Sequence, residues 1–223
     1  MNGVLALLLM KEEYFKKSRY SITEKVCELK GTVKRSIVYA SSNKVVRFIL
    51  GLTALQYIAI QAPNMQWQPL YLGPGGKHVT LGWIWVGIAA LSALGGMVSG
   101  RFLTKVGDEK RALVTAQAAI GCGIALAGAF RLIPVSLLIF LLHEVARGLF
   151  KPLHDVYLND NIPSKERATI ISCGSILYHL AGIIGLVGSG YLAVRTSIGL
   201  TWVVSGTVLL AGTLILAKNG KKH

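Results

Sequence analysis

A series of long apolar segments constrains the fold of this chain more than any other feature. Crossing a bilayer core of about 30 Å takes roughly 17 to 25 mainly apolar residues. Six segments are long enough, namely residues 45–63, 81–103, 112–130, 132–154, 168–194 and 198–217. Only 15% of the 223 residues are charged and the mean hydropathy is +0.54, values too apolar for an ordinary soluble domain. The sequence therefore predicts an all-α, polytopic membrane protein with six transmembrane helices.

The net charge of +14 is explained by where the basic residues lie. If the N-terminus is cytoplasmic, all but four of the 24 Lys and Arg residues fall on the cytoplasmic side; the exceptions are Lys77, Arg131, Arg195 and, within a span, Arg147. This asymmetry follows the positive-inside rule. It predicts a cell-membrane protein with both termini cytoplasmic, and it removes the need for a nucleic-acid partner to explain the charge.

The segments outside the spans divide into an arm, a loop and a tail. The arm, residues 1–44, has apolar residues at helical spacing, which fits either amphipathic helices on the cytoplasmic surface or a solvated linker. The stretch PNMQWQPLYLGPGGKHVT after the first span reads as an external loop, with Trp67 and Tyr71 in the interfacial aromatic belt. Residues 218–223 form a basic cytoplasmic tail.

Polar side chains concentrate in two of the spans. The first carries Gln56, Tyr57 and Gln61, and the fourth carries His143, Glu144 and Arg147. Because polar and ionisable groups are costly in lipid, these two spans are expected to face protein or water, and the third and sixth spans to face lipid. The six helices thus read as two units of three with the same order of polarity.

The three ionisable groups of the fourth span can meet on one side of a helix, because His143 and Glu144 precede Arg147 by four and three residues. Glu144 and Arg147 oppose insertion by roughly 6 kcal/mol, while the apolar residues of this span favour it by roughly 5 kcal/mol. The helix is therefore expected to present its charged face to an internal cavity, opening toward the cytoplasm.

Three interpretations of this site stay open. Glu144 and Arg147 are a structural pair, or they handle a solute or a proton, or they belong to an enzyme, which is the least favoured. HEVAR begins like the zinc-protease motif HExxH, but Arg147 replaces the second histidine and disfavours a metal. His179 is either a hydrogen-bonded core histidine or a second proton-handling group. Cys27, Cys122 and Cys173 are scattered and lack CxxC spacing, so neither a disulfide framework nor a zinc site is expected. No cofactor is expected, although coupling to protons is possible if Glu144 or His179 handles a proton.

Small residues recur on two spans. Gly96 and Gly100 form a GxxxG pattern, and Gly182, Gly185 and Gly188 repeat every three residues. Such faces let another helix backbone approach closely. Close packing is the favoured interpretation, and a hinge for rocking motion is the alternative.

Two stretches resemble the major facilitator superfamily of transporters. SGRFLTKVGDEKRA is similar to the loop between the second and third helices of a six-helix half, through Gly100, Lys105, Gly107 and Arg111. RGLFKPLHDVYLNDNIPSKERATIIS is similar to the tenth and eleventh helices with their cytoplasmic link, including Asp160 and Arg167. Residues 45–217 resemble the C-terminal half of such a transporter. The arm then resembles the central cytoplasmic loop, preceded by the last turns of a sixth helix in NGVLALLL.

The resemblance implies secondary active transport of a small solute by alternating access. The solute or proton pathway would be formed by His143, Glu144, Arg147, Gln56, Tyr57, Gln61 and His179. The cytoplasmic gate loops would contain Gly100, Lys105, Gly107, Arg111, Asp160 and Arg167. Such folds place the substrate cavity between two halves, so the expected partner is an N-terminal six-helix half or a second copy. The alternative function is a non-transporting membrane subunit or pseudo-transporter that binds a partner through its polar helix face.

Overall fold

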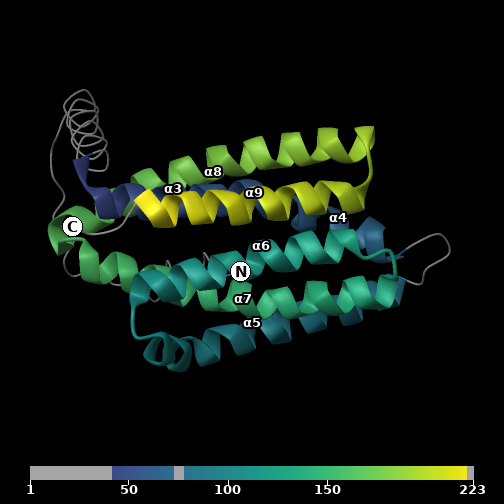
Figure 1. The fold of residues 1–223 in the computed structure, drawn as a ribbon, viewed down its shortest axis with the longest axis horizontal. Helices are drawn as coiled ribbons and strands as arrows, with labels where there is room; N and C mark the ends of the chain where they lie inside the picture. The colour runs from purple at the N-terminus through teal and green to yellow at the C-terminus, as the bar shows by residue number, and fades with distance from the viewer. Residues whose placement is uncertain (1–41, 73–77, 220–223) are drawn as a thin grey trace, which may run out of the picture.

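The computed structural model describes residues 42–72 and 78–219, and these form a bundle of long helices (Figure 1). In chain order the helices are α3 (Lys44–Ala59), α4 (Gln61–Leu72), α5 (His78–Val106), α6 (Glu109–Ala129), α7 (Ile133–Asn161), α8 (Ser164–Arg195) and α9 (Ile198–Asn219). The expected arm, most of the tail and the end of a preceding helix lie outside the described residues.

Six membrane-length spans are found among the described residues, because α3 and α4 together make one span from Lys44 to Leu72. The other five correspond to single helices and lie where the sequence predicts them. Several are longer than predicted: α5 and α7 have 29 residues each. At 1.5 Å per residue such a helix is about 44 Å long, which exceeds the hydrocarbon core and carries its ends into the interfaces.

The first span contains the main departure from the sequence prediction. Residues that we expected to form an external loop belong to helix α4, and Trp67 and Tyr71 are buried rather than placed in an aromatic belt. Pro63 accounts for the break between α3 and α4, because its missing N–H and its ring prevent a helical hydrogen bond to the carbonyl of Ala59. The chain therefore turns at Ile60 and resumes as helix instead of leaving the membrane.

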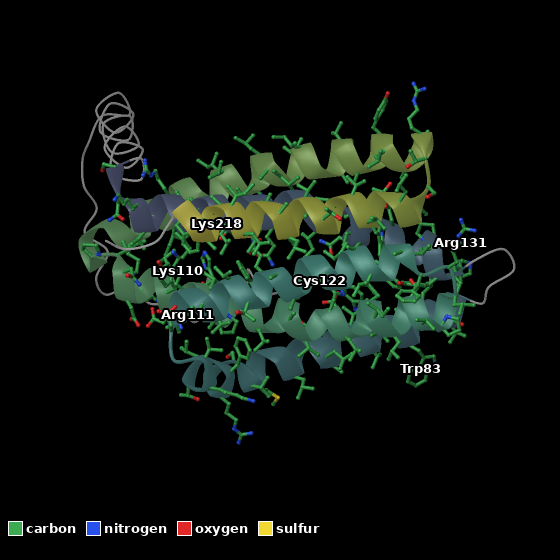
Figure 2. The ribbon with its side chains drawn as sticks, viewed as in Figure 1. Trp83, Lys110, Arg111, Cys122, Arg131 and Lys218 are labelled. Carbon is green, nitrogen blue, oxygen red and sulfur yellow. The ribbon has the colours of Figure 1, made fainter. Side chains whose placement is uncertain are left out.

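The connections divide between the two ends of the bundle (Figure 1). The end at which α3 begins also holds the α5–α6 and α7–α8 connections, and we call it the basic end. Lys110, Arg111 and Lys218 lie there, whereas Arg131 lies at the other end, which we call the opposite end (Figure 2). The described basic side chains are therefore distributed as the positive-inside argument expects.

The helices pack mainly between the two three-helix units rather than within them. The unit of α3–α6 meets the unit of α7–α9 through the pairs α3 with α8, α5 with α7, and α6 with α9. The first helices of the two units run in opposite directions (Figure 1). This pairing is that of an inverted repeat, in which each unit supplies the same kinds of contact to the other.

Helix α6 is more buried than its low polarity suggested. Leu113, Gln117, Ile120 and Ile124 are fully buried between α6 and its neighbours α7 and α9. The Gln117 amide donates to the carbonyl of Leu52, 2.8 Å away, so α6 also fastens α3. The expectation that the third span faces lipid therefore holds only for the outer stripe of this helix.

Glycines bring the units together, although not always those that the patterns singled out. Gly95 rather than Gly96 or Gly100 lies against α7, where an added Cβ would meet the Val145 carbonyl and lie 3.0 Å from the Cα of Gly148. A Cβ at Gly100 would meet nothing within 4 Å. The GxxxG pattern thus identified the correct helix but not the contact face.

Candidate functional site

A polar cavity of about 830 Å³ lies between α3, α4, α7 and α8. It extends from the middle of the bundle toward the basic end, because its lining on α7 and α8 comes from the halves of these helices nearest that end. From α3 and α4 it is lined by Thr53, Gln56, Tyr57, Ile60, Gln61 and Asn64. From α7 and α8 it is lined by Arg147, Phe150, Lys151, His154, Asp155, Leu158, Asn159, Ile171, Ser175, Tyr178 and His179.

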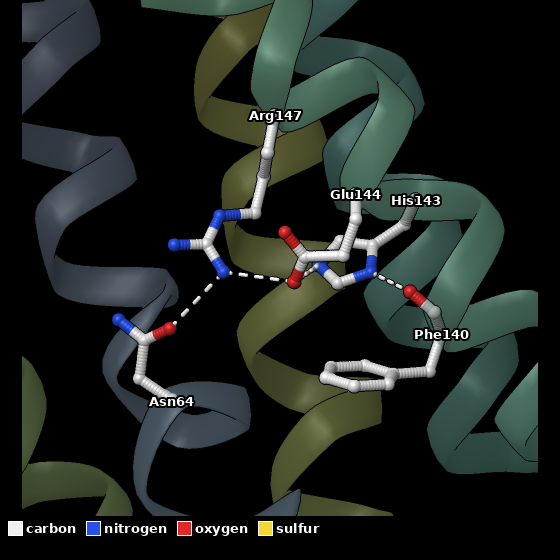
Figure 3. A network of polar contacts seen from close by, with 5 residues as sticks. All are labelled: Asn64, Phe140, His143, Glu144 and Arg147. Carbon is white, nitrogen blue, oxygen red and sulfur yellow. Dashed lines mark hydrogen bonds and ion pairs between the residues drawn. The ribbon is translucent and has the colours of Figure 1, made fainter. Parts of the chain in front are cut away.

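Arg147 connects the cavity to a buried polar network (Figure 3). Its Nη1 donates to Glu144 Oε1 at 2.9 Å and to Asn64 Oδ1 at 3.2 Å, so one nitrogen joins α7 to α4. The Glu144 side chain is only 2% exposed, whereas that of Arg147 is 29% exposed. Arg147 is therefore the member of this pair that a molecule in the cavity can touch.

His143 lies behind the pair, away from the cavity. Its Nε2 is 3.7 Å from Glu144 Oε1, and its Nδ1 contacts the carbonyl oxygen of Phe140. The ring sits where α6 has Gly123, and a Cβ at that position would overlap the Cβ of His143. The expectation that His143, Glu144 and Arg147 all line the cavity is thus met only by Arg147, because His143 packs against Gly123 on α6 and Glu144 is buried beside the His143 ring.

A second charged cluster lines the cavity nearer the basic end. Lys151 Nζ is 2.8 Å from Asp155 Oδ2, and His154 Nδ1 is 3.0 Å from Asp155 Oδ1. The Nε2 atom of His154 is buried without a hydrogen-bond partner among the described residues. Asp155 thus has both carboxylate oxygens occupied by neighbours on its own helix.

An aromatic pair forms the facing wall. The rings of Tyr57 on α3 and Tyr178 on α8 are stacked, with centroids 5.3 Å apart and planes 18° from parallel. Gln56, Gln61 and His179 line the same cavity, as the sequence predicted them to do, although their roles stay predictions. The cavity thus combines a guanidinium and amide groups with two tyrosine rings.

The expected gate-loop residues lie toward the basic end, where two of them, Gly107 and Arg167, shape turns. Gly107 has a φ of 74°, a conformation that favours glycine, and ends α5. Arg167 Nη2 donates to the carbonyls of Asn159 at 2.7 Å and Ile162 at 3.2 Å, which closes the turn from α7 to α8. Gly100, Lys105, Arg111 and Asp160 are exposed at this end. A gating role for all six residues stays a prediction.

Several lining residues are absent from the predicted pathway. Asn64 is missed because its segment has the composition of a loop. Helical spacing places Lys151, His154 and Asp155 on the same face of α7 as Arg147. The position of Arg147 could therefore have predicted that all three line the cavity. Tyr178 carries no such signal, since one tyrosine in an apolar helix is ordinary. Among residues 42–72 and 78–219, no group of His, Cys, Asp and Glu has the geometry to hold a metal ion.

A comparison with known protein families identifies the family of this chain. The profile of the Major Facilitator Superfamily matches residues 47–221, which cover α3 from Arg47 onward and all of α4 to α9. The chain belongs to this superfamily. Comparisons with curated proteins and with solved structures gave no significant match.

Membership of this superfamily confirms three predictions: the chain takes part in transmembrane transport, it is not an enzyme, and its fold is an all-α multi-pass bundle. The major facilitator superfamily consists of multi-pass membrane transporters, which are not enzymes, so the chain is a component of transmembrane transport. The described helices form an all-helical bundle consistent with half of the superfamily fold. The polar cavity of α3, α4, α7 and α8 therefore lies in a member of a transporter family.

Proposed function

We propose that this chain moves a small solute across a cell membrane by secondary active transport with alternating access. The observation that carries the proposal is the polar cavity, in which Arg147 sits near the middle of a membrane-spanning bundle. An ionisable group at such depth is costly and marks a pathway in many membrane proteins. Binding sites near the midplane, between helical repeats, are typical of secondary transporters.

The proposed orientation places the basic end in the cytoplasm. Support comes from the described basic residues: apart from Arg147 within its span, only Arg131 and Arg195 lie in the opposite half. The positive-inside rule relates such an asymmetry to cytoplasmic exposure. In this orientation the polar cavity is open toward the cytoplasm.

The chain acts as the C-terminal half of the fold in this proposal, and a second six-helix unit supplies the missing wall. The support is that all lining residues come from α3, α4, α7 and α8, which form one side of a pathway. A matching N-terminal half or a second copy of this chain fits that place. Proton coupling through Glu144 is a further element of the proposal, because its buried carboxylate sits beside Arg147.

Uptake and release measurements over many candidate solutes at once test this function. Membrane vesicles that contain the full chain, alone or co-expressed with a six-helix N-terminal half, are incubated with a metabolite mixture, and each solute is followed by mass spectrometry. We expect one class of solute to move, and Arg147→Lys to reduce its movement at least about tenfold. Movement that is indifferent to Glu144→Gln, Arg147→Ala and the double change would contradict the assigned roles. Loss of abundance alone would favour the non-transporting subunit.

A further inference from the structure

We propose that the solute is an organic anion with a single carboxylate, which binds the free edge of the Arg147 guanidinium. This inference rests on the transport function proposed above, whose site it specifies. It is argued from the hydrogen bonds of Arg147, from the charges around it and from the apolar surfaces of the cavity.

The guanidinium of Arg147 is only half used by the protein. Nη1 makes both contacts, to Glu144 and to Asn64, and these hold the plane of the group in place (Figure 3). The edge formed by Nε and Nη2 makes no hydrogen bond within the described part of the chain. Two parallel N–H groups of this kind match the two oxygens of a carboxylate. Arg147 therefore presents a fixed fork of donors to the cavity.

The distribution of acidic groups favours an anion over a cation. The Glu144 carboxylate is 2% exposed and lies behind Arg147, so it does not reach the cavity. Both oxygens of Asp155 are held by Lys151 and His154. These are the acidic side chains beside the cavity among the described residues, and each already has a basic partner: the buried Glu144 is paired with Arg147, and Asp155, which is 48% exposed, is paired with Lys151.

The charge count also favours a monoanion over a phosphate. Lys151 is paired with Asp155, and its side chain is 82% exposed at the rim. Among the described lining residues, Arg147 alone presents an unused pair of parallel N–H donors, so a second negative charge in the cavity would find no comparable site. A carboxylate held by two directed hydrogen bonds suits this balance better than a doubly charged group.

The remaining walls suit a flat apolar body attached to the carboxylate. The stacked rings of Tyr57 and Tyr178 line one side, and Phe150 lies on the same helix as Arg147. Aromatic rings pack well against other flat groups with centroid separations of about 4.5 to 7 Å. Benzoate is therefore a suitable probe.

Protection of a cavity cysteine tests the inference. Ser175 lines the cavity on α8. In the full chain in membranes, with Cys27, Cys122 and Cys173 changed to serine, Ser175→Cys is labelled with a maleimide in the presence of benzoate, benzamide, phenyl phosphate or benzylammonium. We expect benzoate to protect at a concentration about tenfold lower than benzamide, because a charge-assisted hydrogen bond is stronger than a neutral one.

Variants of Arg147 assign the preference to the guanidinium. The double change Glu144→Gln with Arg147→Gln avoids a buried unpaired charge, and it is expected to abolish the difference between benzoate and benzamide. Arg147→Lys keeps the positive charge but lacks the two parallel N–H donors. It should lose most of the difference in protection between benzoate and benzamide. Arg101→Gln, at an exposed arginine on α5, is the matched control and should leave protection unchanged.

Equal protection by benzoate and benzamide would overturn the inference, as would stronger protection by phenyl phosphate or benzylammonium, or a preference that survives the double change. Protection measures occupancy rather than movement. A failure here therefore leaves alternating access untouched, and a failure of the transport measurement leaves the carboxylate preference standing.

Discussion

Arg147 and Glu144 divide their tasks through unequal exposure. The carboxylate is buried beside the His143 ring and the Arg147 guanidinium, while the guanidinium reaches the cavity. Removing one partner of a buried pair leaves an uncompensated charge, whereas replacing both leaves none. In the proposed function the pair therefore has two tasks: it stabilises the fold, and it holds in place the edge of Arg147 that binds the solute.

Single and double substitutions separate these two tasks. Arg147→Ala is expected to lower the free energy of unfolding by about 3 kcal/mol, because Glu144 loses its partner. Adding Glu144→Gln to this change should restore much of the loss. Thermal unfolding of the purified chain in detergent gives the comparison. A double variant no more stable than Arg147→Ala would show that the buried charge is not the cause.

At this scale the sequence predicted which residues lie close together better than where their side chains point. The spacing of His143, Glu144 and Arg147 correctly placed them within reach of one another. It did not distinguish the side chain that lines the cavity from the two that do not, because Gly123, the residue that makes room for His143, lies on another helix. Tertiary contacts of this kind leave no mark on local periodicity.

At the scale of helices, the two units are fastened by glycines at equivalent places. Gly95 on α5 meets α7, and Gly185 on α8 meets α3, where an added Cβ would lie 2.7 Å from the Cα of Ile58. Helices α6 and α9 approach through Gly121 with Gly206 and Gly128 with Gly199. Because backbone meets backbone at these points, a side chain there has no room to move aside.

Alanine substitutions on α5 test this packing with an internal control. Gly95→Ala should lower the unfolding free energy by about 2 kcal/mol, as overpacking does. Gly100→Ala, on the same helix, meets nothing within 4 Å and should be neutral or raise stability by up to about 1 kcal/mol, because alanine favours helix. Equal effects in thermal unfolding would contradict the contact face assigned to α5.

The corresponding pair on α8 tests the repeat. Gly185→Ala is expected to destabilise the bundle as much as Gly95→Ala does, because both abut the first helix of the other unit. Gly188→Ala meets nothing within 4 Å and serves as its control. The same unfolding measurement applies, and a tolerated Gly185→Ala would argue against equivalent packing of the two units.

Helix α4 closes the cavity toward the opposite end. The Gln66 amide donates to the Ser189 carbonyl on α8, 3.1 Å away. Losing one such hydrogen bond costs about 1 kcal/mol, enough to shift an opening equilibrium about fivefold. Gln66→Ala should therefore increase labelling of Ser175→Cys from the opposite end several-fold. Gln68→Ala, at an exposed position on α4, should not. An unchanged rate for Gln66→Ala would exclude this contact as a closure.

Helices α5 to α9 were predictable from hydropathy because each is a long apolar run with a short polar connection. The α4 segment was not, since its prolines, glutamines and asparagine resemble a loop by composition. Its polar side chains are accommodated because they line the cavity or, like Gln66, bond to a neighbouring helix. Composition reports the average environment of a segment and not the cavity that one of its faces borders.

At the scale of the whole molecule, the described helices form an inverted repeat around a cavity. This arrangement fits one half of the proposed solute pathway. The proposed orientation places the basic end in the cytoplasm, and the cavity lies between the middle of the bundle and that end. A transporter of this kind must expose the same cavity to both sides in turn. The central claim is therefore that Ser175 and its neighbours become accessible from each side of the membrane.

Two-sided labelling of Ser175→Cys tests this claim most directly. The variant, in the background without other cysteines, is treated with a membrane-impermeant thiol reagent in right-side-out and in inverted vesicles, with the six-helix N-terminal half co-expressed. We predict labelling from both sides, faster from the side of the basic end, with benzoate slowing both rates. Labelling from one side only, under every condition and with Gln66→Ala as well, would contradict alternating access.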